Sequence, residues 1–462
     1  MFNQGGYTMN HLWKRRTIRP SLLGGLLMLT AGVLAAPSAS AAIPVSERQV
    51  LLDIYTSTNG DDWIDNSGWN GAEGTECEWY GISCDAAGEH VTSINLYWNN
   101  LAGSIPLLQG LERLVSFNAY SNKLTGEIPS LQGLDNLSQF YVGSNQLTGP
   151  IPSLQGLERL VLFDVASNQL TGEIPPLQGL DNLSQFYVGS NQLTGPIPSL
   201  QGLGSLYQFS ARSNKLTGEI PPLQGLSNLT YFSAYNNQLT GSIPSLQGLD
   251  SLYYFDVNSN QLTGSIPPLT GLESLEFFDV AFNQLTGSIP PLMGLGSLGF
   301  FDAAFNQLTG EIPPLQGLDS LYYLNVRSNQ LTGSIPSLMG LESLELFYVA
   351  FNQLTGEIPS LQGLDSLYDF DAGSNQLTGS IPSLQGLDSL SAFTVANNRL
   401  RGEVADVPHP NSLRPGWSRL CPNYLDPTPS ADWDAATGTA PWYQNCEPLP
   451  DPLYVNGFDP DA

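Results

Sequence analysis

Residues 131–152 read LQGLDNLSQFYVGSNQLTGPIP, and residues 177–198 repeat the same letters. Both stretches belong to a longer series in which Asn returns every 23 residues, without insertion or deletion, at positions 99, 122, 145, 168, 191, 214, 237, 260, 283, 306, 329, 352, 375 and 398. In twelve of these fourteen units the Asn is followed, two residues later, by Leu-Thr-Gly. A fixed period of this length is typical of a solenoid, in which each repeat forms one coil of a stack.

Each unit carries seven apolar residues at fixed places, which in one unit are Leu137, Phe140, Val142, Leu147, Ile151, Leu154 and Leu157. Polar and apolar residues alternate over 139–143, which predicts a short strand with Phe140 and Val142 pointing inward. Gly149 and Pro152 exclude a long helix on the return path of the coil. Since one unit cannot bury its apolar side chains alone, the units are expected to share one continuous core.

The repeated Asn has a structural explanation. Where a strand turns away from the sheet, backbone donors and acceptors face inward without partners. A buried Asn amide offers two donors and one acceptor, so it can bond to its own coil and to the adjacent coil. We therefore interpret the fourteen Asn residues as scaffold and not as a binding site.

Units such as LDNLSQFYVGSNQLTGPIP follow the pattern Leu-x-x-Leu-x-x-Leu-x-Leu-x-x-Asn-x-Leu-x-Gly-x-Ile-Pro. This pattern resembles the leucine-rich repeats of plant extracellular proteins over roughly residues 91–404, although the plant units usually have 24 residues. The resemblance implies a leucine-rich repeat solenoid of about 14 repeats, a curved right-handed superhelix with a parallel β-sheet on its concave face and irregular or 3₁₀ return segments. It also implies recognition, because such domains form receptor ectodomains and inhibitors of wall-degrading enzymes.

Both ends of the array are expected to be capped. All four cysteines lie outside the repeats, and of three connectivities the local pairing of Cys77 with Cys84 and of Cys421 with Cys446 is favoured. These spacings match no redox motif, so we interpret the cysteines as structural disulfides. The stretch WNG…CEWYGISC resembles the N-terminal cap of the same repeat family.

The N-terminal cap should begin with a helix and end against the first strand. Residues 46–49 are a capping-box start. Trp63, Trp69 and Trp79 can cover the open end of the core and protect an edge strand at 91–96.

The first 41 residues predict an export signal. Basic residues precede 15 apolar residues at 22–36, and Ala39-Ser40-Ala41 fits a cleavage site. An uncleaved anchor and twin-arginine export at Arg15-Arg16 are the alternatives. No other apolar run reaches 18 residues, so no further membrane span is expected. The expected organisation is a signal peptide at 1–41, an N-terminal cap with a disulfide at 42–90, the repeat array at 91–404, a C-terminal cap with a disulfide at 405–450 and a loose tail at 451–462.

Composition excludes several classes of function. The chain has 42 acidic and 15 basic residues and a formal net charge of −27, which argues against binding nucleic acid or anionic membranes. It has three histidines, too few to favour histidine catalysis or a zinc site. The letters of residues 294–299 match GxGxxG but lead into a strand, not a helix. We therefore expect neither an enzyme nor a cofactor nor a metal site.

Two columns of residues mark a candidate ligand-binding surface on the strands. Six residues before the repeated Asn, five successive units carry Tyr231, Tyr254, Phe277, Phe300 and Tyr323. Four residues before it, three of these units carry Asp256, Asp279 and Asp302. These positions are expected to point outward on the concave side, where five strands about 4.8 Å apart would hold a stripe of roughly 19 Å.

An exposed aromatic stripe beside an acidic row suits a partner with apolar and cationic groups, or sugar rings that stack on the aromatics. Two alternatives remain open: the rings stabilise neighbouring strands by cross-strand contact, or the Asp row holds Ca²⁺. Phe282, Phe305 and Phe351, directly before their Asn, are expected to pack at the corner of the coil.

The sequence thus predicts an exported, non-enzymatic protein whose concave face binds a protein or a carbohydrate. We expect a monomer that is secreted, or located at the cell surface or in the periplasm. The alternative is a structural or adhesive spacer at the cell surface. Asn136, Asn182 and Asn228 lie in Asn-x-Ser/Thr sites that would carry glycans only in a eukaryotic secretory host.

Overall fold

The computed structural model describes residues 42–408, 411–444 and 446. The expected signal peptide at 1–41 and the expected tail at 451–462 lie outside the described residues. Among the described residues, no helix is long and apolar enough to cross a membrane.

Each repeat contributes one short strand to a parallel sheet, in which a residue pairs with its equivalent one period away, as Tyr254 does with Phe277. The main sheet contains fifteen strands among the described residues: β1 (Ile82–Cys84), β2 (Val91–Asn95), β4 (Ser116–Asn118), β6 (Gln139–Tyr141), β7 (Leu162–Asp164), β8 (Gln185–Tyr187), β9 (Gln208–Ser210), β10 (Tyr231–Ser233), β11 (Tyr254–Asp256), β12 (Phe277–Asp279), β13 (Phe300–Asp302), β14 (Tyr323–Asn325), β15 (Leu346–Tyr348), β16 (Asp369–Asp371) and β17 (Ala392–Thr394). The period seen in the sequence is therefore the period of the coils.

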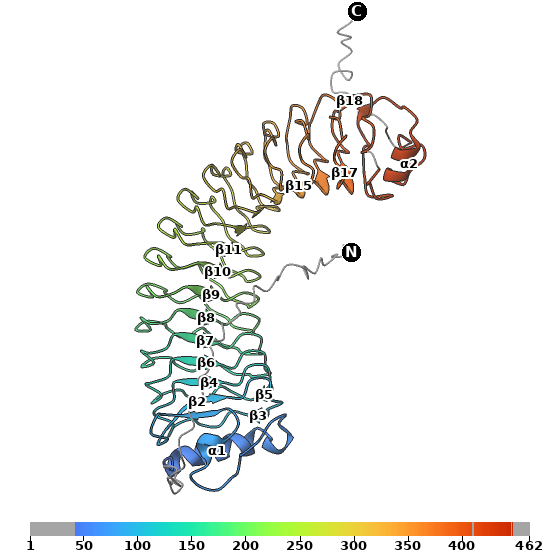
Figure 1. Cartoon of the computed structure of the whole chain (residues 1–462). Helices are drawn as coiled ribbons and strands as arrows, with labels where there is room; N and C mark the ends of the chain where they lie inside the picture. Colours follow the sequence, from blue (N-terminus) through green and yellow to red (C-terminus); the bar gives the residue numbers. More distant parts are fainter. Residues whose placement is uncertain (1–41, 409–410, 445, 447–462) are drawn as a thin grey trace, which may run out of the picture. The chain divides into compact units, whose positions relative to one another are not determined.

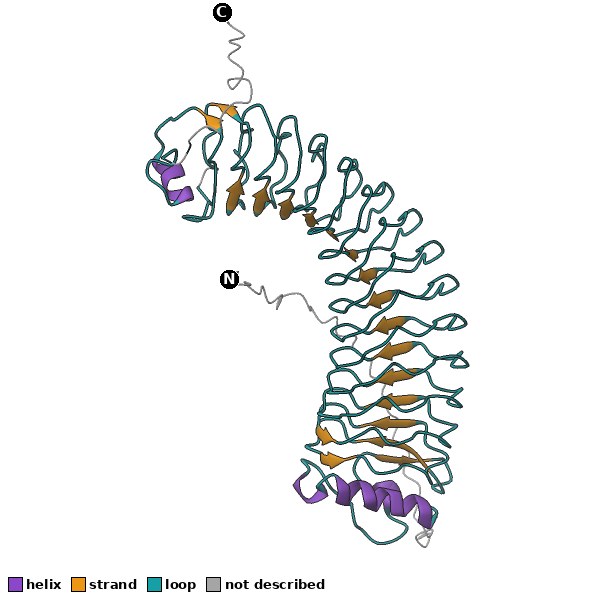
Figure 2. Cartoon of the chain, turned by 180° about the vertical axis from the view of Figure 1, so that it is seen from behind, coloured by secondary structure: helices purple, strands orange, loops and turns teal. Residues whose placement is uncertain are grey.

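The strands follow one another along the inner side of the stack, and the return segments form its outer side (Figures 1 and 2). The return segments of the repeats are irregular and contain isolated tight turns, such as the bond from the Leu134 amide to the Leu131 carbonyl at 3.2 Å. Gly133 lies in such a turn at φ 85°, a backbone conformation that favours glycine. A second strip of contacts begins with β3 (Ala102–Ser104) and β5 (Lys123–Thr125) and continues as single bridges, for example between Glu127 and Thr148.

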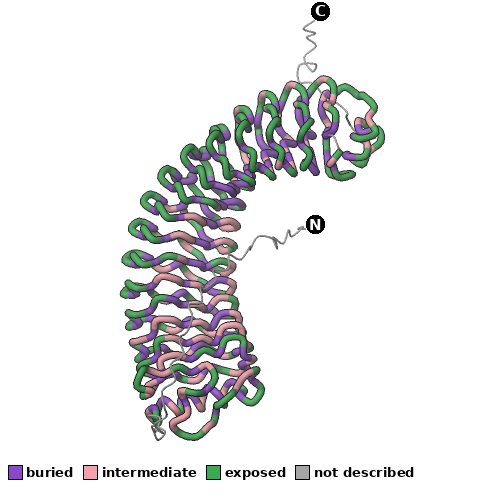
Figure 3. The backbone as a smooth tube through the Cα atoms, in the orientation of Figure 1, coloured by how far each residue is buried: buried purple, intermediate pink, exposed green. Residues whose placement is uncertain are grey.

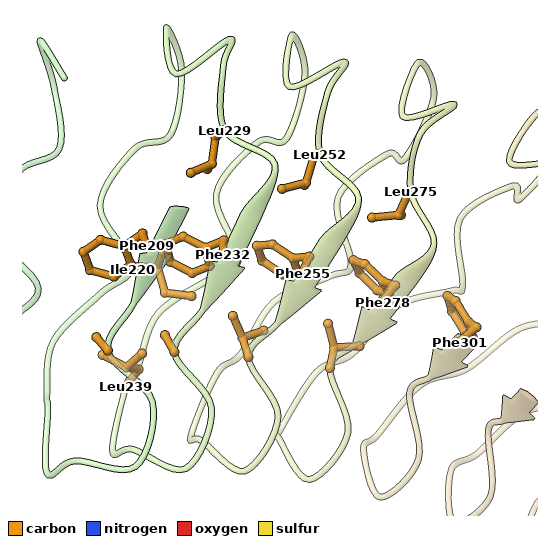
Figure 4. Packing of buried hydrophobic residues seen from close by; sticks show 14 of the residues in the cluster. Phe209, Ile220, Leu229, Phe232, Leu239, Leu252, Phe255, Leu275, Phe278 and Phe301 are labelled. Carbon is orange, nitrogen blue, oxygen red and sulfur yellow. The ribbon is translucent and has the colours of Figure 1, made fainter. Parts of the chain in front are cut away.

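The core runs through all coils as one continuous cluster of apolar side chains. Figure 3 shows that buried residues recur in each coil of the stack. Figure 4 shows the centre of the cluster, where the inward Phe of each strand stacks on that of the next strand. Ring centroids are 5.4–5.6 Å apart over the series Phe209, Phe232, Phe255, Phe278 and Phe301. Each of these rings is fully buried, which contributes about 1.5–3 kcal/mol per side chain.

The repeated Asn forms the ladder that the sequence predicts. Asn145 donates from Nδ2 to the carbonyls of Val142 and Gly143 in its own coil and to that of Ala119 in the preceding coil, at 3.0–3.2 Å. Its Oδ1 accepts the amide of Leu124 at 2.9 Å. The same contacts recur at Asn168 and along the array, so these side chains fasten each coil to its neighbour.

The N-terminal cap differs from the expectation at its first helix, α1 (Val45–Ser57). The helix follows Pro44 and has no side-chain cap, so the predicted capping box at 46–49 is wrong. Glu47 instead turns to the sheet, where its carboxylate accepts the amide of Val91 and contacts the ring of His90, both at 2.7 Å. The carboxylate of Glu47 thus links the helix to β2. This contact joins residues far apart in the chain, so a capping motif read from four consecutive residues cannot predict it.

Other parts of the N-terminal cap close the open end of the core. Trp63, Trp69 and Trp79 are buried against it, with the short 3₁₀ turns at Gly60–Asp62 and Glu76–Glu78 beside them. The strand β1 pairs antiparallel with β2 and covers its edge. A disulfide joins Cys77 to Cys84, the pairing that the sequence favours.

The C-terminal cap packs a second helix, α2 (Ala431–Thr437), on the last coil. Ser430 caps this helix by accepting the amide of Trp433, whose buried indole donates to the carbonyl of Ala405 at 2.9 Å. The pair β18 (Arg401–Gly402) and β19 (Tyr424–Leu425) extends the outer strip, and a disulfide joins Cys421 to Cys446.

Candidate ligand-binding face

The aromatic residues at the position six before the Asn form a continuous column, which we call the ring column: Tyr231, Tyr254, Phe277, Phe300 and Tyr323. Their strands, β10 to β14, pair in register, so each ring lies directly beside the next. Neighbouring centroids are 4.2–4.4 Å apart and the planes differ by 7–13°. The rings therefore stack face to face along the sheet.

The spacing of the ring column reveals how strongly the sheet curves here. The core rings behind the same strands have centroids 5.5–5.6 Å apart, whereas the centroids of the ring column are 4.2–4.4 Å apart. The shorter spacing lies on the concave side, because curvature brings equivalent side chains closer on that side. The curvature of the sheet thus brings the neighbouring rings of the column into contact.

This stacking changes the prediction of an exposed stripe. Phe300 is only 4% exposed, and Tyr254 and Phe277 are half-buried, since each ring covers the faces of its neighbours. Their edges remain toward solvent. Sugar rings stack on aromatic faces, so this column does not offer the stacking surface that the sequence suggested.

The acidic residues of the adjacent column, which we call the carboxylate row, are also less exposed than expected. Asp256, Asp279 and Asp302 are 3%, 9% and 7% exposed. They were expected to face outward into solvent, but in the structure all three are buried.

Polar side chains at both ends of the carboxylate row donate hydrogen bonds to its carboxylates. Asn258 donates from Nδ2 to Asp256 at 2.8 Å and to Asp279 at 3.0 Å, and Asn325 donates to Asp302 at 3.0 Å. The hydroxyl of Tyr254 donates to Asp256 at 3.0 Å, and that of Tyr323 donates to Asp302 at 3.1 Å.

Burial controls the ionisation of this row. It raises the pKa of Asp256 and of Asp302 to about 6. Burial and the charges of the two flanking carboxylates raise the pKa of Asp279 well above its usual value of 3.8. No set of three or more His, Cys, Asp or Glu residues in the described parts of the chain is arranged to hold a metal ion.

Three phenylalanines at the end of the strands are placed differently from the expectation. Phe282, Phe305 and Phe351 were expected to pack at the coil corner, but they are 54%, 41% and 52% exposed. Each has a positive φ of 52–57°. Every residue directly before the repeated Asn from Ser121 to Asn397 also has a positive φ, and this conformation turns the side chain away from the core.

These three residues and Arg327 form one surface, which we call the phenylalanine edge. The rings of Phe282 and Phe305 stack at 4.4 Å. The guanidinium of Arg327 lies 5.7 Å from the ring of Phe305 and 5.4 Å from that of Phe351. Eight of the fourteen units have Ser at this position, which is the sequence signal that could have identified the edge.

A hollow of about 470 Å³ opens at the opposite end of the strands, where the chain enters them. We call it the rim hollow; its lining residues are Tyr253, Tyr254, Glu276, Phe277, Ser297, Gly299, Ser320 and Tyr322. It exists because Gly299 supplies no side chain between Glu276 and Tyr322 in the column seven before the Asn. A single-residue gap in a column gives no periodic signal, so the sequence analysis missed it.

Comparisons with known proteins agree with this architecture. The model of the Leucine Rich Repeat family matches residues 320–341. The solved structure of PEPR1–AtPEP1 superposes with a TM-score of 0.71 at 29% sequence identity, over 82% of this chain and 59% of that chain. The chain is a leucine-rich repeat protein. Among curated proteins, none is significantly similar in sequence.

Two further structures resemble this leucine-rich repeat protein. The Arabidopsis receptor kinase HAESA, in complex with the peptide hormone IDA and the co-receptor SERK1, has a TM-score of 0.66 at 30% identity, over 83% of this chain and 66% of that chain. The plant peptide hormone receptor RGFR1, in complex with RGF2, has a TM-score of 0.63 at 26% identity, over 76% of this chain and 68% of that chain. This chain spans 59% and 66% of the lengths of PEPR1 and HAESA in those structures.

Proposed function

We propose that this leucine-rich repeat protein is a non-enzymatic binding protein that acts outside the cytoplasm and recognises a peptide or protein ligand on its concave face. Similarity to ectodomain structures solved with peptide hormones supports ligand binding by the repeat array. The basic and apolar segments at the start of the chain support export. A protein ligand is favoured over a glycan because the ring column presents edges and not faces.

The phenylalanine edge is the observation that carries this proposal. A positive φ is unfavourable for a bulky side chain, and exposing three large rings to water is unfavourable as well. Ser occupies the same position in eight other units. Its side chain is small and polar, so both the positive φ and the exposure to water are less unfavourable for it. Contact with an apolar part of a ligand would offset both costs, whereas a spacer gains nothing from them.

Replacing Phe282, Phe305 and Phe351 together with Ser tests the proposal. We expect the variant to fold with an unchanged or higher thermal midpoint, because the substitutions restore the residue found in other coils. To measure binding, the full chain is immobilised and exposed to extracellular extract of its source, and the retained proteins are quantified by mass spectrometry. We expect the variant to retain at least tenfold less ligand than the wild type.

The matched control replaces Ser144, Ser167 and Ser190 with Ala, at the same position in other coils. This control should retain the ligand as the wild type does. Equal retention by the phenylalanine variant would contradict the proposal and favour the spacer.

A further inference from the structure

We propose that the rim hollow binds a guanidinium or ammonium side chain of the ligand. This inference rests on the proposed function and specifies the chemistry of the partner: a peptide segment with a basic residue that enters this hollow. The argument has three steps, which concern the shape of the hollow, its charge and its distance from the phenylalanine edge.

The hollow is shaped by two tyrosine rings on either side of a gap. The ring of Tyr253 packs edge-on against Tyr254 at 6.3 Å, and the ring of Tyr322 is tilted against Phe300 at 6.3 Å, so the ring column supports both. A Cβ atom built on Gly299 would lie 2.7 Å from Cε1 of Tyr322, which shows that this ring leans over the glycine. Any larger residue at 299 would displace the ring and fill the gap.

The charge of the hollow is negative and uncompensated. Glu276 is exposed on its wall, and no ion pair of the described residues includes it. Its charge acts on both phenols: burial, then Glu345 and Glu276, raise the pKa of Tyr322, and Glu276 is also among the groups that raise the pKa of Tyr253, where burial is the main cause. Glu276 lines the hollow together with both rings.

Two aromatic rings beside a carboxylate are the groups that bind an organic cation. A cation over the face of a tyrosine ring is attracted by the electrons of the ring, and a charge-assisted hydrogen bond to a carboxylate is stronger than a neutral one. The nearest arginines of these strands are engaged elsewhere: Arg212 contacts Tyr235, and Arg327 lies between rings of the phenylalanine edge. A sugar would use the hydroxyls of Ser297 and Ser320 but would leave the carboxylate charge unpaired.

The distance between the hollow and the phenylalanine edge predicts the spacing in the ligand. The two surfaces lie seven and one residues before the Asn, so six residues of the chain separate them, of which three form the strand. At about 3.3 Å per extended residue, roughly 20 Å is the upper limit of their separation. An extended peptide covers this distance with about six residues. A ligand that uses both surfaces therefore carries a basic residue and an apolar residue no more than about six positions apart.

The test uses three small probes: acetyl-Gly-Arg-Gly-amide, the same peptide with citrulline, which keeps the shape and removes the charge, and cellobiose. Binding to the full chain is measured by ligand-observed NMR titration at low salt. We expect the arginine peptide to bind at least tenfold more tightly than the citrulline peptide. Glu276→Gln should remove this difference, and Glu311→Gln, an exposed carboxylate on the outer strip, should leave it unchanged.

Equal binding of both peptides, or an undiminished preference in Glu276→Gln, would overturn the inference. Binding of cellobiose alone would overturn it in favour of a glycan subsite. These failures differ from a failure of the proposed function: if the triple Phe→Ser variant loses the captured ligand while Glu276→Gln keeps it, the concave face still binds a ligand and only the cation assignment is wrong.

Discussion

Replacing Asn283 with Ala is expected to lower the free energy of unfolding by about 3–5 kcal/mol, because several buried hydrogen bonds disappear at about 1–3 kcal/mol for each group left unpaired. Asn283 donates from Nδ2 to the carbonyls of Val257, Val280 and Ala281 at 3.1–3.2 Å. Its Oδ1 accepts the amide of Leu262 at 2.9 Å, and this amide has no other partner among the described residues.

Urea unfolding of the full chain, followed by circular dichroism, measures the loss of stability. Hydrogen exchange adds a local readout, since the Leu262 amide should exchange faster than amides several coils away. Asn236→Ser is the matched control: Asn236 is exposed in a neighbouring coil, and Ser occupies its position in adjacent units, so the stability should not change. An Asn283→Ala variant as stable as the wild type would contradict the ladder as the main link between coils.

Replacing Asp279 with Asn is expected to raise the thermal midpoint of the protein at pH 7.5 and to have little effect at pH 4. The pKa of Asp279 is raised well above 3.8 by burial and by two neighbouring carboxylates, so its ionisation opposes folding. Asn keeps the shape of the side chain without the charge.

The same shifts determine the pH dependence of the wild type. Between the unfolded pKa of about 4 and the folded pKa of about 6, the folded state binds more protons than the unfolded state. The contribution of the row is therefore fully present below about pH 4 and is lost as the pH rises through 6 and above.

Calorimetry at pH 4.0 and 7.5 measures both effects. Exposed Asp319→Asn serves as the control and should shift the midpoint equally little at both pH values. The burial argument fails if Asp279→Asn is no more stable than the wild type at pH 7.5.

Sequence and structure agree where the 23-residue period alone decides the environment. The inward Phe of each strand, the buried Leu positions and the Asn ladder follow from the period, since equivalent residues in stacked coils meet the same neighbours. The pairing of the cysteines also followed from their separation in sequence. The start of the helix in the N-terminal cap could not be predicted in this way, because Glu47 accepts a hydrogen bond from Val91, 44 positions away.

The candidate site was only partly predictable. The sequence identified the columns, such as Phe277 beside its equivalents in adjacent coils, and the direction in which they point. It did not show that Phe300 and the carboxylate row are buried, because their burial depends on the distance between side chains of neighbouring coils on the concave side. It predicted that Phe282 packs at the corner of the coil, because the left-handed turn before the Asn is a property of the backbone and not of the residue type at that position.

The amino-acid sequence by itself determined the coil, its period, the residues that fill the core and the amide that joins one coil to the next. Each of these depends on interactions that recur identically in every unit. The tertiary structure decided which side chains reach solvent: curvature shortens the spacing on the concave side to 4.2–4.4 Å, and the gap at Gly299 opens a hollow. Accessibility is set by the packing of different coils against one another, and no single repeat contains that information.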